Sequence, residues 1–306
     1  MGTPDFAVAS LEVLINHGKQ VVAVVTAVDK AQGRGKKIKS SAVKKYATSL
    51  NIPVLQPSNL KSEDLLEELA SFKADVFIVV AFRVLPKLVW DMPKAGTFNL
   101  HASLLPQYRG AAPINWAIIN GEKTTGVTTF RINDNIDTGD IMFQEEEDIL
   151  ASDTAGTLHG RLMKKGAGLV LKTINSIENG HIPSIPQRER THLQPAPKIY
   201  KNDCQIDFQK STEQVYNFIR GLSPYPGAWF KIRGMVFRVL LALVEKNELI
   251  STPGILRTDN QSYIQIGCSD GWISIQELQM QGKRAMSTSE FLRGNSLETG
   301  MVQDHD

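Results

Sequence analysis

Cysteine is scarce in this sequence, and the two that occur, Cys204 and Cys268, lack the spacing of a metal site or a redox pair. There is no HExxH pattern and no cluster of Cys and His, so we expect no metal. No apolar run approaches the ~20 residues that a membrane span needs. The first residues lack the basic, apolar and small-residue order of a signal peptide. These absences predict a cytoplasmic protein without a membrane partner.

An excess of charge of one sign is also missing. Lys plus Arg number 34 against 32 for Asp plus Glu, which gives a net charge of +2. Net charge therefore does not indicate a nucleic-acid partner, and any basic surface must come from local clustering. With 306 residues and 42% hydrophobic content, the chain can bury a large core, and we expect two domains.

The first part of the chain alternates strands with helices. The apolar runs Gln20–Thr26 and Asp75–Val80 are typical of strands that are covered on both faces. Amphipathic patterns predict helices over Ser62–Phe72 and Thr154–Asn179. This alternation predicts an α/β fold with a doubly wound, parallel, Rossmann-like sheet over residues 1–181.

The pattern changes after residue 181. Closely spaced prolines with charged residues between them mark residues 182–200 as a linker. Short strands with turn signals follow, which predict a small β-barrel over residues 201–306. The predicted strands are 228–232, 235–244, 255–257, 263–267 and 272–278.

A strand that ends near residue 101 carries the residues that are best suited to catalysis. Asn99 and His101 are two residues apart, so their side chains lie on the same face of the predicted sheet. An Asn amide can donate a hydrogen bond to a developing oxyanion, and His can take or give a proton near neutral pH. Asp137, in a later loop, is a candidate third group that orients the imidazole. This set suits acyl-type transfer to an amine.

Three short motifs resemble the signature of the folate-dependent formyltransferases. They are Asn99-x-His101, the loop Ser103-Leu104-Leu105-Pro106 and the turn Asp137-Thr138-Gly139. Segments 108–115 and 1–6 narrow the resemblance, which covers nearly the whole chain, to members that act on methionyl-tRNA.

The resemblance implies an activity and a site. A monomer would transfer a formyl group from 10-formyltetrahydrofolate to the α-amine of initiator methionyl-tRNA, and the second domain would be OB-like. Asn99, His101 and Asp137 would be catalytic, and the loop 81–86 would help to line the folate pocket, chiefly through its backbone groups. The implied folate-binding residues are Ser103, Leu104, Leu105, Pro106, Phe82, Leu85 and Ile136.

Residues 30–45 contain seven Lys or Arg and no acidic residue. By composition alone this segment is most simply a solvated basic loop, whereas a contact with phosphates is the alternative. The resemblance favours the second interpretation, because the equivalent loop in the family holds the tRNA acceptor end. The implied tRNA-binding residues are Arg34, Lys36, Lys37 and Lys39.

Several alternatives stay open at the level of sequence. His101 alone is as compatible with a hydrogen-bonded core histidine as with catalysis, and Asp140 competes with Asp137 for the carboxylate role. Ser103 lacks the surroundings of a nucleophile elbow, so we expect it to shape the loop. The acceptor could instead be glycinamide ribonucleotide, an amino sugar or water. A non-catalytic tRNA-binding protein is the alternative from a different class.

The residues Met1–Pro4 resemble the turn that follows the first strand in this family. No strand precedes them in the sequence. We therefore expect that the start has been placed one strand too late. Otherwise a central strand of the sheet is missing.

Overall fold

The computed structural model describes residues 1–32, 37–188, 192–245 and 251–302, and only the backbone of 31, 32 and 37. The chain forms two compact units. The N-terminal unit contains residues 1–110, 125–147 and 160–195, and the C-terminal unit contains residues 111–124, 148–159 and 196–306. Each unit is therefore built from separate stretches of the sequence.

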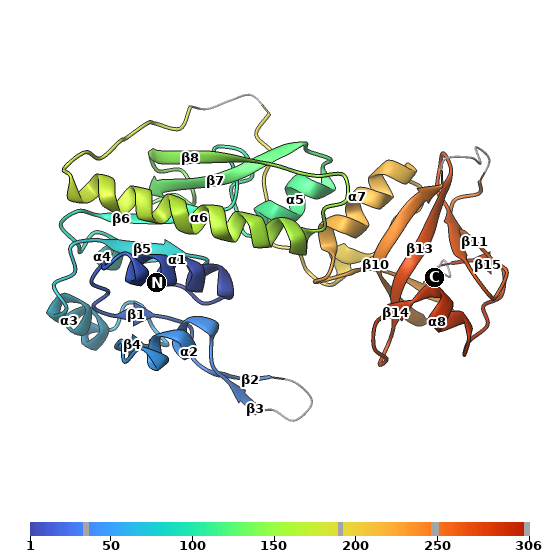
Figure 1. Ribbon diagram of the computed structural model, residues 1–306, viewed down its shortest axis with the longest axis horizontal. Coiled ribbons are helices and arrows are strands. Elements are labelled where there is room, and N and C mark those ends of the chain that lie inside the picture. Colours follow the sequence, from blue (N-terminus) through green and yellow to red (C-terminus); the bar gives the residue numbers. More distant parts are fainter. Residues whose placement is uncertain (33–36, 189–191, 246–250, 303–306) are drawn as a thin grey trace. The chain divides into compact units, whose positions relative to one another are not determined.

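The N-terminal unit is an open sheet covered by helices (Figure 1). Four strands lie in the order β5–β6–β7–β8, with β5 and β6 parallel and β6 and β7 antiparallel. A parallel pair, β1 and β4, forms a second small sheet. The predicted Rossmann-like fold is thus confirmed, with an antiparallel addition. The strand bounds are β1 Val24–Val25, β4 Val54–Leu55, β5 Phe77–Val80, β6 Thr97–His101, β7 Thr124–Arg131 and β8 Ile141–Asp148.

Five helices belong wholly or mostly to this unit. Their bounds are α1 Asp5–Asn16, α2 Ala42–Ser49, α3 Glu63–Ser71, α4 Lys87–Trp90 and α6 Ala155–Glu178. The long helix α6 lies on one face of the sheet: a Cβ added to Gly166 would be 2.8 Å from Leu100, and the Thr173 and Thr129 hydroxyls are 2.9 Å apart. Because side chains alternate along a strand, Asn99 and His101 face the opposite side from Leu100.

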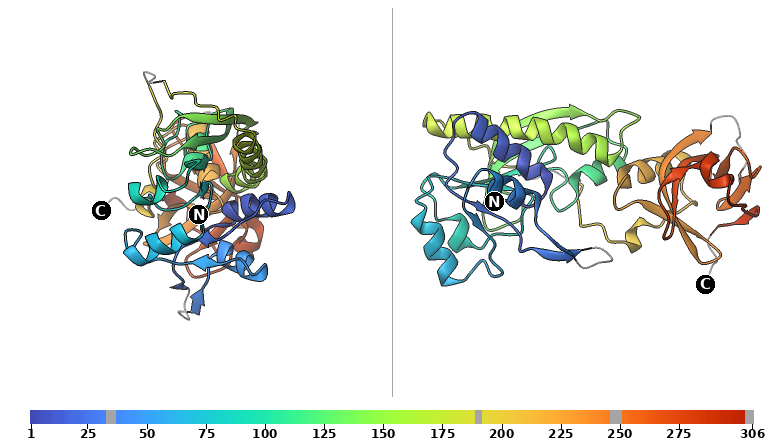
Figure 2. Two further views of the ribbon diagram at one scale, coloured as in Figure 1. Left: turned by 90° about the vertical axis from the view of Figure 1, so that its left-hand side faces the viewer. Right: turned by 60° about the horizontal axis from the view of Figure 1, so that its bottom comes forward.

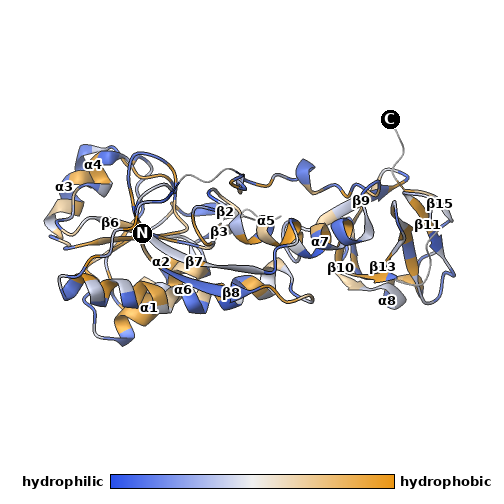
Figure 3. Ribbon diagram, turned by 90° about the horizontal axis from the view of Figure 1, so that it is seen from above, coloured by the Kyte–Doolittle hydropathy of each residue, from blue (hydrophilic) through white to orange (hydrophobic). Residues whose placement is uncertain are grey.

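Helix α6 also meets the hydrophilic second half of β8 (Figure 3). Glu147 accepts from Arg161 Nε at 2.8 Å and pairs with Lys165 Nζ at 2.9 Å. Hydrogen bonds from these two cations hold the pKa of Glu147 below its usual value.

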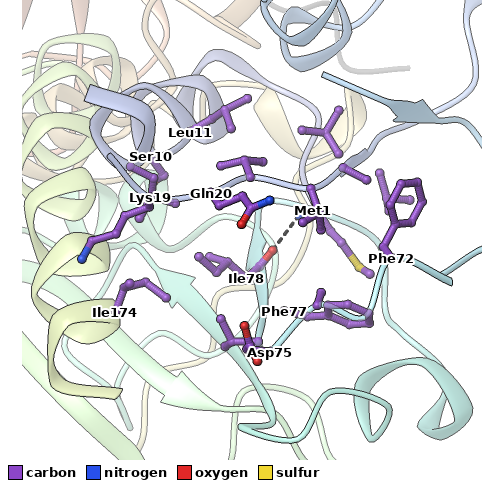
Figure 4. Close-up of a pocket in the computed structure, with 18 of the residues that line it drawn as sticks. Met1, Ser10, Leu11, Lys19, Gln20, Phe72, Asp75, Phe77, Ile78 and Ile174 are labelled. Carbon is purple, nitrogen blue, oxygen red and sulfur yellow. Dashed lines mark hydrogen bonds between the residues drawn. The ribbon is translucent and has the colours of Figure 1, made fainter. Parts of the chain in front are cut away.

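A gap one strand wide separates β1 from β5. Gly2 fills its end, because Gly2 N donates to Val25 O at 3.0 Å and forms a parallel bridge with Val80. Beyond the amine of Met1, the space between the two strands continues as a cavity of about 640 Å³ (Figure 4). Residues 20–23 line this cavity instead of pairing with a neighbouring strand, so the predicted strand Gln20–Thr26 was wrong in length and only β1 remains.

The cavity walls are mainly apolar. The amine of Met1 reaches into it and donates to Ile78 O at 2.6 Å, and burial lowers the pKa of this amine to about 5. The Ser10 hydroxyl also lines the cavity, is buried and has no hydrogen-bond partner within the described ranges. Apolar walls come from α1 and α6 on one face and from α3 and β5 on the other, with Leu11, Leu14, Ile174, Ile177, Leu69, Phe72 and Phe77 among them.

The C-terminal unit is a curled antiparallel sheet in the order β15–β11–β12–β13–β10–β9, with β14 beside β13. Phe237 lies in its core and stacks on Phe230 at 5.7 Å. The barrel-like domain predicted from the sequence is confirmed, while β14, β15 and α8 were not predicted. The bounds are α5 Pro113–Ile119, the 3₁₀ turn Asn202–Cys204, α7 Thr212–Leu222, β9 Ala228–Ile232, β10 Met235–Glu245, β11 Ile255–Thr258, β12 Ile264–Gly267, β13 Trp272–Met280, β14 Met286–Ser287, α8 Thr288–Leu292 and β15 Gly300–Met301.

Candidate active site

Strand β6 positions the two side chains that the sequence singled out. Asn99 lies opposite Val79 of β5 and Phe130 of β7, and His101 lies opposite Thr128. The Asn99 Oδ1 atom is buried and has no hydrogen-bond partner among the described residues. A buried polar group without a partner is uncommon in a folded chain, and a bound molecule is one way to satisfy it.

His101 is held between a carbonyl and a carboxylate. The residue is 6% exposed, and Nε2 is 2.8 Å from the carbonyl oxygen of Tyr108. A carbonyl oxygen only accepts, so Nε2 carries the hydrogen in this contact. The other ring nitrogen, Nδ1, faces Asp137 Oδ2 at 3.8 Å. This distance is too long for a direct hydrogen bond.

Asp137 sits in a tight turn between β7 and β8. Its φ of +55° lies in the left-handed region, and its Oδ2 accepts from Gly110 N at 2.9 Å. Gly139 is required by packing, since an added Cβ would be 1.6 Å from Arg131 O. Asp140 accepts from Ser184 Oγ at 2.5 Å. Asp137 is therefore the carboxylate of this turn that faces His101.

The loop after β6 is held by hydrogen bonds within the loop and by side chains of β7 and β8. Ser103 Oγ donates to Gln107 O at 2.7 Å, and Thr128 Oγ1 donates to Ser103 O at 2.6 Å. Gln144 Nε2 donates to Leu105 O at 2.9 Å. The Ser103 hydroxyl thus shapes the loop.

The residues predicted to bind folate differ in exposure. The side chains of Ser103, Leu105 and Leu85 are buried in the protein. The other four are half-buried or exposed, namely Leu104, Pro106, Phe82 and Ile136.

The loop after β5 is anchored by Arg83. The Arg83 guanidinium donates to Pro57 O and, at 3.0 Å, to Ser58 O. It also lies 5.6 Å from the centre of the Phe82 ring. These contacts hold the loop against the segment that follows β4.

The basic segment is partly a hairpin. Strands β2 (Lys30–Gln32) and β3 (Lys37–Lys39) pair antiparallel and project from the rest of the unit (Figure 2). Lys39 is exposed, and Lys37 belongs to β3. Arg34 and Lys36 lie outside the described residues.

Asp29 anchors the base of this hairpin. Its carboxylate accepts from Lys44 Nζ at 2.7 Å, from Gln56 Nε2 at 2.7 Å and from Ser40 Oγ at 3.2 Å. The hydrogen bonds from Lys44 and Gln56 lower the pKa of Asp29. The two ends of the hairpin are therefore tied together beside α2.

Two further residues near the site were missed by sequence reasoning. Gln187 and Arg109 contact each other, and Gln187 also contacts the Asp137 turn. Gln187 lies in the segment predicted as a linker, where composition carries no sign of a site. Within the described parts of the chain, no group of three or more His, Cys, Asp or Glu could hold a metal ion. No helix in those parts is long and apolar enough to cross a membrane.

In this chain an open α/β sheet carries Asn99 and His101 beside Asp137, and a curled antiparallel domain follows in sequence. Residues 1–174 match the family model "Formyl transferase", and residues 198–296 match "Formyl transferase, C-terminal domain". The chain belongs to the formyl transferase family.

Named relatives indicate which kind of formyl transferase this chain is similar to. The chain is 50% identical over 307 aligned residues to a methionyl-tRNA formyltransferase of Azobacteroides pseudotrichonymphae, covering 97% of this chain and 95% of that one. It is 48% identical to the enzyme of the same name from Bacteroides fragilis, covering 96% and 93%. In fold it is similar to an N-formyltransferase from Helicobacter canadensis in complex with folinic acid and dTDP-3-aminofucose, with a TM-score of 0.66, 24% identity and coverage of 90% and 96%.

Proposed function

We propose that this protein transfers a formyl group from 10-formyltetrahydrofolate to the α-amine of initiator methionyl-tRNA. The observation that carries the proposal is the convergence of Asn99, His101 and Asp137 beside the loop 103–110. High identity to methionyl-tRNA formyltransferases over almost the whole chain supports the choice of acceptor.

The chemistry follows from the positions of these side chains. The amine attacks the formyl carbon, and a tetrahedral intermediate forms with negative charge on its oxygen. The Asn99 amide N–H and a proton on Nδ1 of His101, the ring nitrogen that does not bond Tyr108 O, stabilise that oxyanion, an effect worth several kcal/mol in a site that excludes water. Asp137, 3.8 Å from Nδ1, orients His101 and stabilises the imidazolium. The C–N bond to N10 of the folate then breaks, and N10 takes the proton that the amine has lost.

The proposal extends to the organisation of the protein. Residues 1–181 form the catalytic domain, 182–200 the linker and 201–306 the OB-like domain. The matched family regions, 1–174 and 198–296, support this division. One chain supplies all three catalytic side chains, which supports a monomer. Relatives that act on tRNA support a cytoplasmic location.

A competition assay tests the acceptor. The wild-type protein is incubated with 10-formyltetrahydrofolate and equal concentrations of methionyl-tRNA, glycinamide ribonucleotide and a dTDP-amino sugar. The proposal expects formylated methionyl-tRNA as the product formed. Preferential formylation of either small acceptor would overturn the tRNA assignment while leaving the formyl chemistry intact.

Asn99→Ala should lower kcat by roughly 10²- to 10³-fold, because removing one oxyanion donor has an effect of this size. The Kd for 10-formyltetrahydrofolate should stay nearly unchanged, since the amide acts on the developing charge. Single-turnover kinetics and equilibrium folate binding measure the two quantities. Asn16→Ala, at the exposed end of α1, is the control. An Asn99→Ala variant with wild-type kcat would remove Asn99 from the mechanism.

Lys37→Ala combined with Lys39→Ala should raise KM for methionyl-tRNA and leave kcat nearly unchanged. Each lost phosphate contact should also reduce the slope of log KM against log salt by roughly one. Steady-state kinetics at several salt concentrations measure both effects. Lys94→Ala, an exposed lysine away from the hairpin, is the control. If the double variant keeps the wild-type KM and slope, the hairpin is only solvated surface.

A further inference from the structure

The Asp137 turn is held in an uncommon backbone conformation. Asp137 has a φ of +55°, which residues with a Cβ adopt rarely. Such conformations persist where surrounding contacts impose them, and they concentrate at functional sites. The position of the Asp137 carboxylate therefore depends on what holds this turn.

Gln187 holds the turn from the segment that follows α6. Its Nε2 donates to Asp137 O at 3.0 Å and to Gly139 O at 2.7 Å. One side-chain amide thus uses both hydrogens on two carbonyls of the same turn. Only an amide or a cationic side chain has the two N–H donors that are needed to bond both carbonyls.

The other end of the Gln187 amide is fixed as well. Its Oε1 accepts from Arg109 Nε at 3.1 Å and from Arg109 Nη2 at 2.6 Å. Gln187 therefore uses its two donors on the turn and its acceptor on one guanidinium. Glutamate would keep the contact with Arg109 but would set a carboxylate oxygen against two carbonyl oxygens.

Arg109 connects Gln187 to both catalytic partners. The residue before it, Tyr108, supplies the carbonyl that accepts from His101 Nε2 at 2.8 Å. The residue after it, Gly110, donates its N–H to Asp137 Oδ2 at 2.9 Å. Residues 108–110 and Gln187 thus close a ring of hydrogen bonds around the His101–Asp137 pair.

We propose that Gln187 is a positioning residue that sets the orientation of the Asp137 carboxylate toward His101. This inference rests on the proposed formyl transfer. Gln187 donates to the backbone of the turn that carries Asp137, and the proposal assigns its effect on the reaction to the position of that carboxylate. Loss of its two donors lets the turn relax away from a φ of +55° and moves the carboxylate relative to Nδ1.

The test is a double-mutant cycle in the full chain, read as the single-turnover rate of formyl transfer. Gln187→Ala and Gln187→Glu should each lower the rate by roughly 10- to 100-fold, the scale of a small misplacement of a catalytic group. KM for methionyl-tRNA should remain within about twofold of wild type. In an Asp137→Asn background, Gln187→Ala should have little further effect, because both changes remove the same contribution. Gln194→Ala, an exposed glutamine of the same segment, is the control.

Each outcome decides the question. A wild-type rate in both Gln187 variants overturns the inference, and so does an equal loss from Gln187→Ala with and without Asp137→Asn, which indicates a purely structural role. Thermal unfolding of Gln187→Glu, which is close in size to the original side chain, shows whether a slow variant is still folded. Absence of transfer by the wild-type protein would instead be a failure of the proposed function.

Discussion

Replacing His101 with alanine should lower kcat for formyl transfer by roughly 10²- to 10⁴-fold, the range that a positioned acid or base contributes. His101 is the group whose ring contacts both the loop 103–110 and the Asp137 turn, with Nε2 on Tyr108 O and Nδ1 facing Asp137. Alanine removes the proton carrier and leaves Asp137 without its partner. Binding of 10-formyltetrahydrofolate depends on other groups and should change little.

The measurement is single-turnover transfer, with folate binding measured separately. His17→Ala is the matched control, because His17 is exposed and follows α1. Thermal unfolding tests whether the His101 variant keeps its fold, which matters because the change removes the hydrogen bond from Nε2 to the Tyr108 carbonyl. A kcat within about threefold of wild type would contradict a catalytic role for His101.

Joining about five aliphatic residues to Met1 should raise Tm by roughly 5 °C or more. An extended segment of this length can run along the gap between β1 and β5. Each aliphatic side chain buried against the cavity walls contributes about 1.5–3 kcal/mol, and ordering each residue costs about 1–2 kcal/mol. A net gain of a few kcal/mol corresponds to several degrees for a unit of this size.

The same extension should change the pH dependence of stability. Burial lowers the pKa of the folded Met1 amine to about 5, from an ordinary value of 8.0. Between these values the unfolded chain binds the proton and the folded chain does not, so this group makes the unfolding free energy rise with pH. A peptide bond at Met1 removes the amine, and with it this contribution between about pH 5 and 8.

A Gly/Ser segment of equal length separates the two effects. It removes the amine, so the pH slope should flatten, but it has no side chains to fill the cavity, so Tm should rise less. Thermal and denaturant unfolding across this pH range measure both quantities. Equal Tm values for the apolar and Gly/Ser segments would contradict the interpretation of the cavity as a place for a strand.

Much of the fold was predictable because it depends on local patterns. The spacing of Asn99 and His101 placed both side chains on one face of β6, and the structure has them there. The helical periodicity of α3 and α6 also predicted their bounds to within a residue or two. In these cases burial on one face imposes a period that can be read directly from the sequence.

Other features depend on contacts that no local pattern records. Gln187 bonds to Asp137, which lies 50 residues earlier in the sequence. Gln187 belongs to a proline-rich segment whose residues show no periodicity. On the side of the gap, β1 meets Gly2, whose N–H donates to Val25 O, whereas residues 20–23 line the cavity and do not extend the strand. Strands β14 and β15 have two residues each, too few to show alternation.

The most direct test of the account is single-turnover formylation with the wild-type chain. The protein, in excess, is mixed with 10-formyltetrahydrofolate and methionyl-tRNA, and both tetrahydrofolate and N-formylmethionyl-tRNA are followed over time. The account predicts that the two products appear together in equal amounts. Tetrahydrofolate that appears without formylated tRNA would show hydrolysis instead of transfer, and would contradict the central claim.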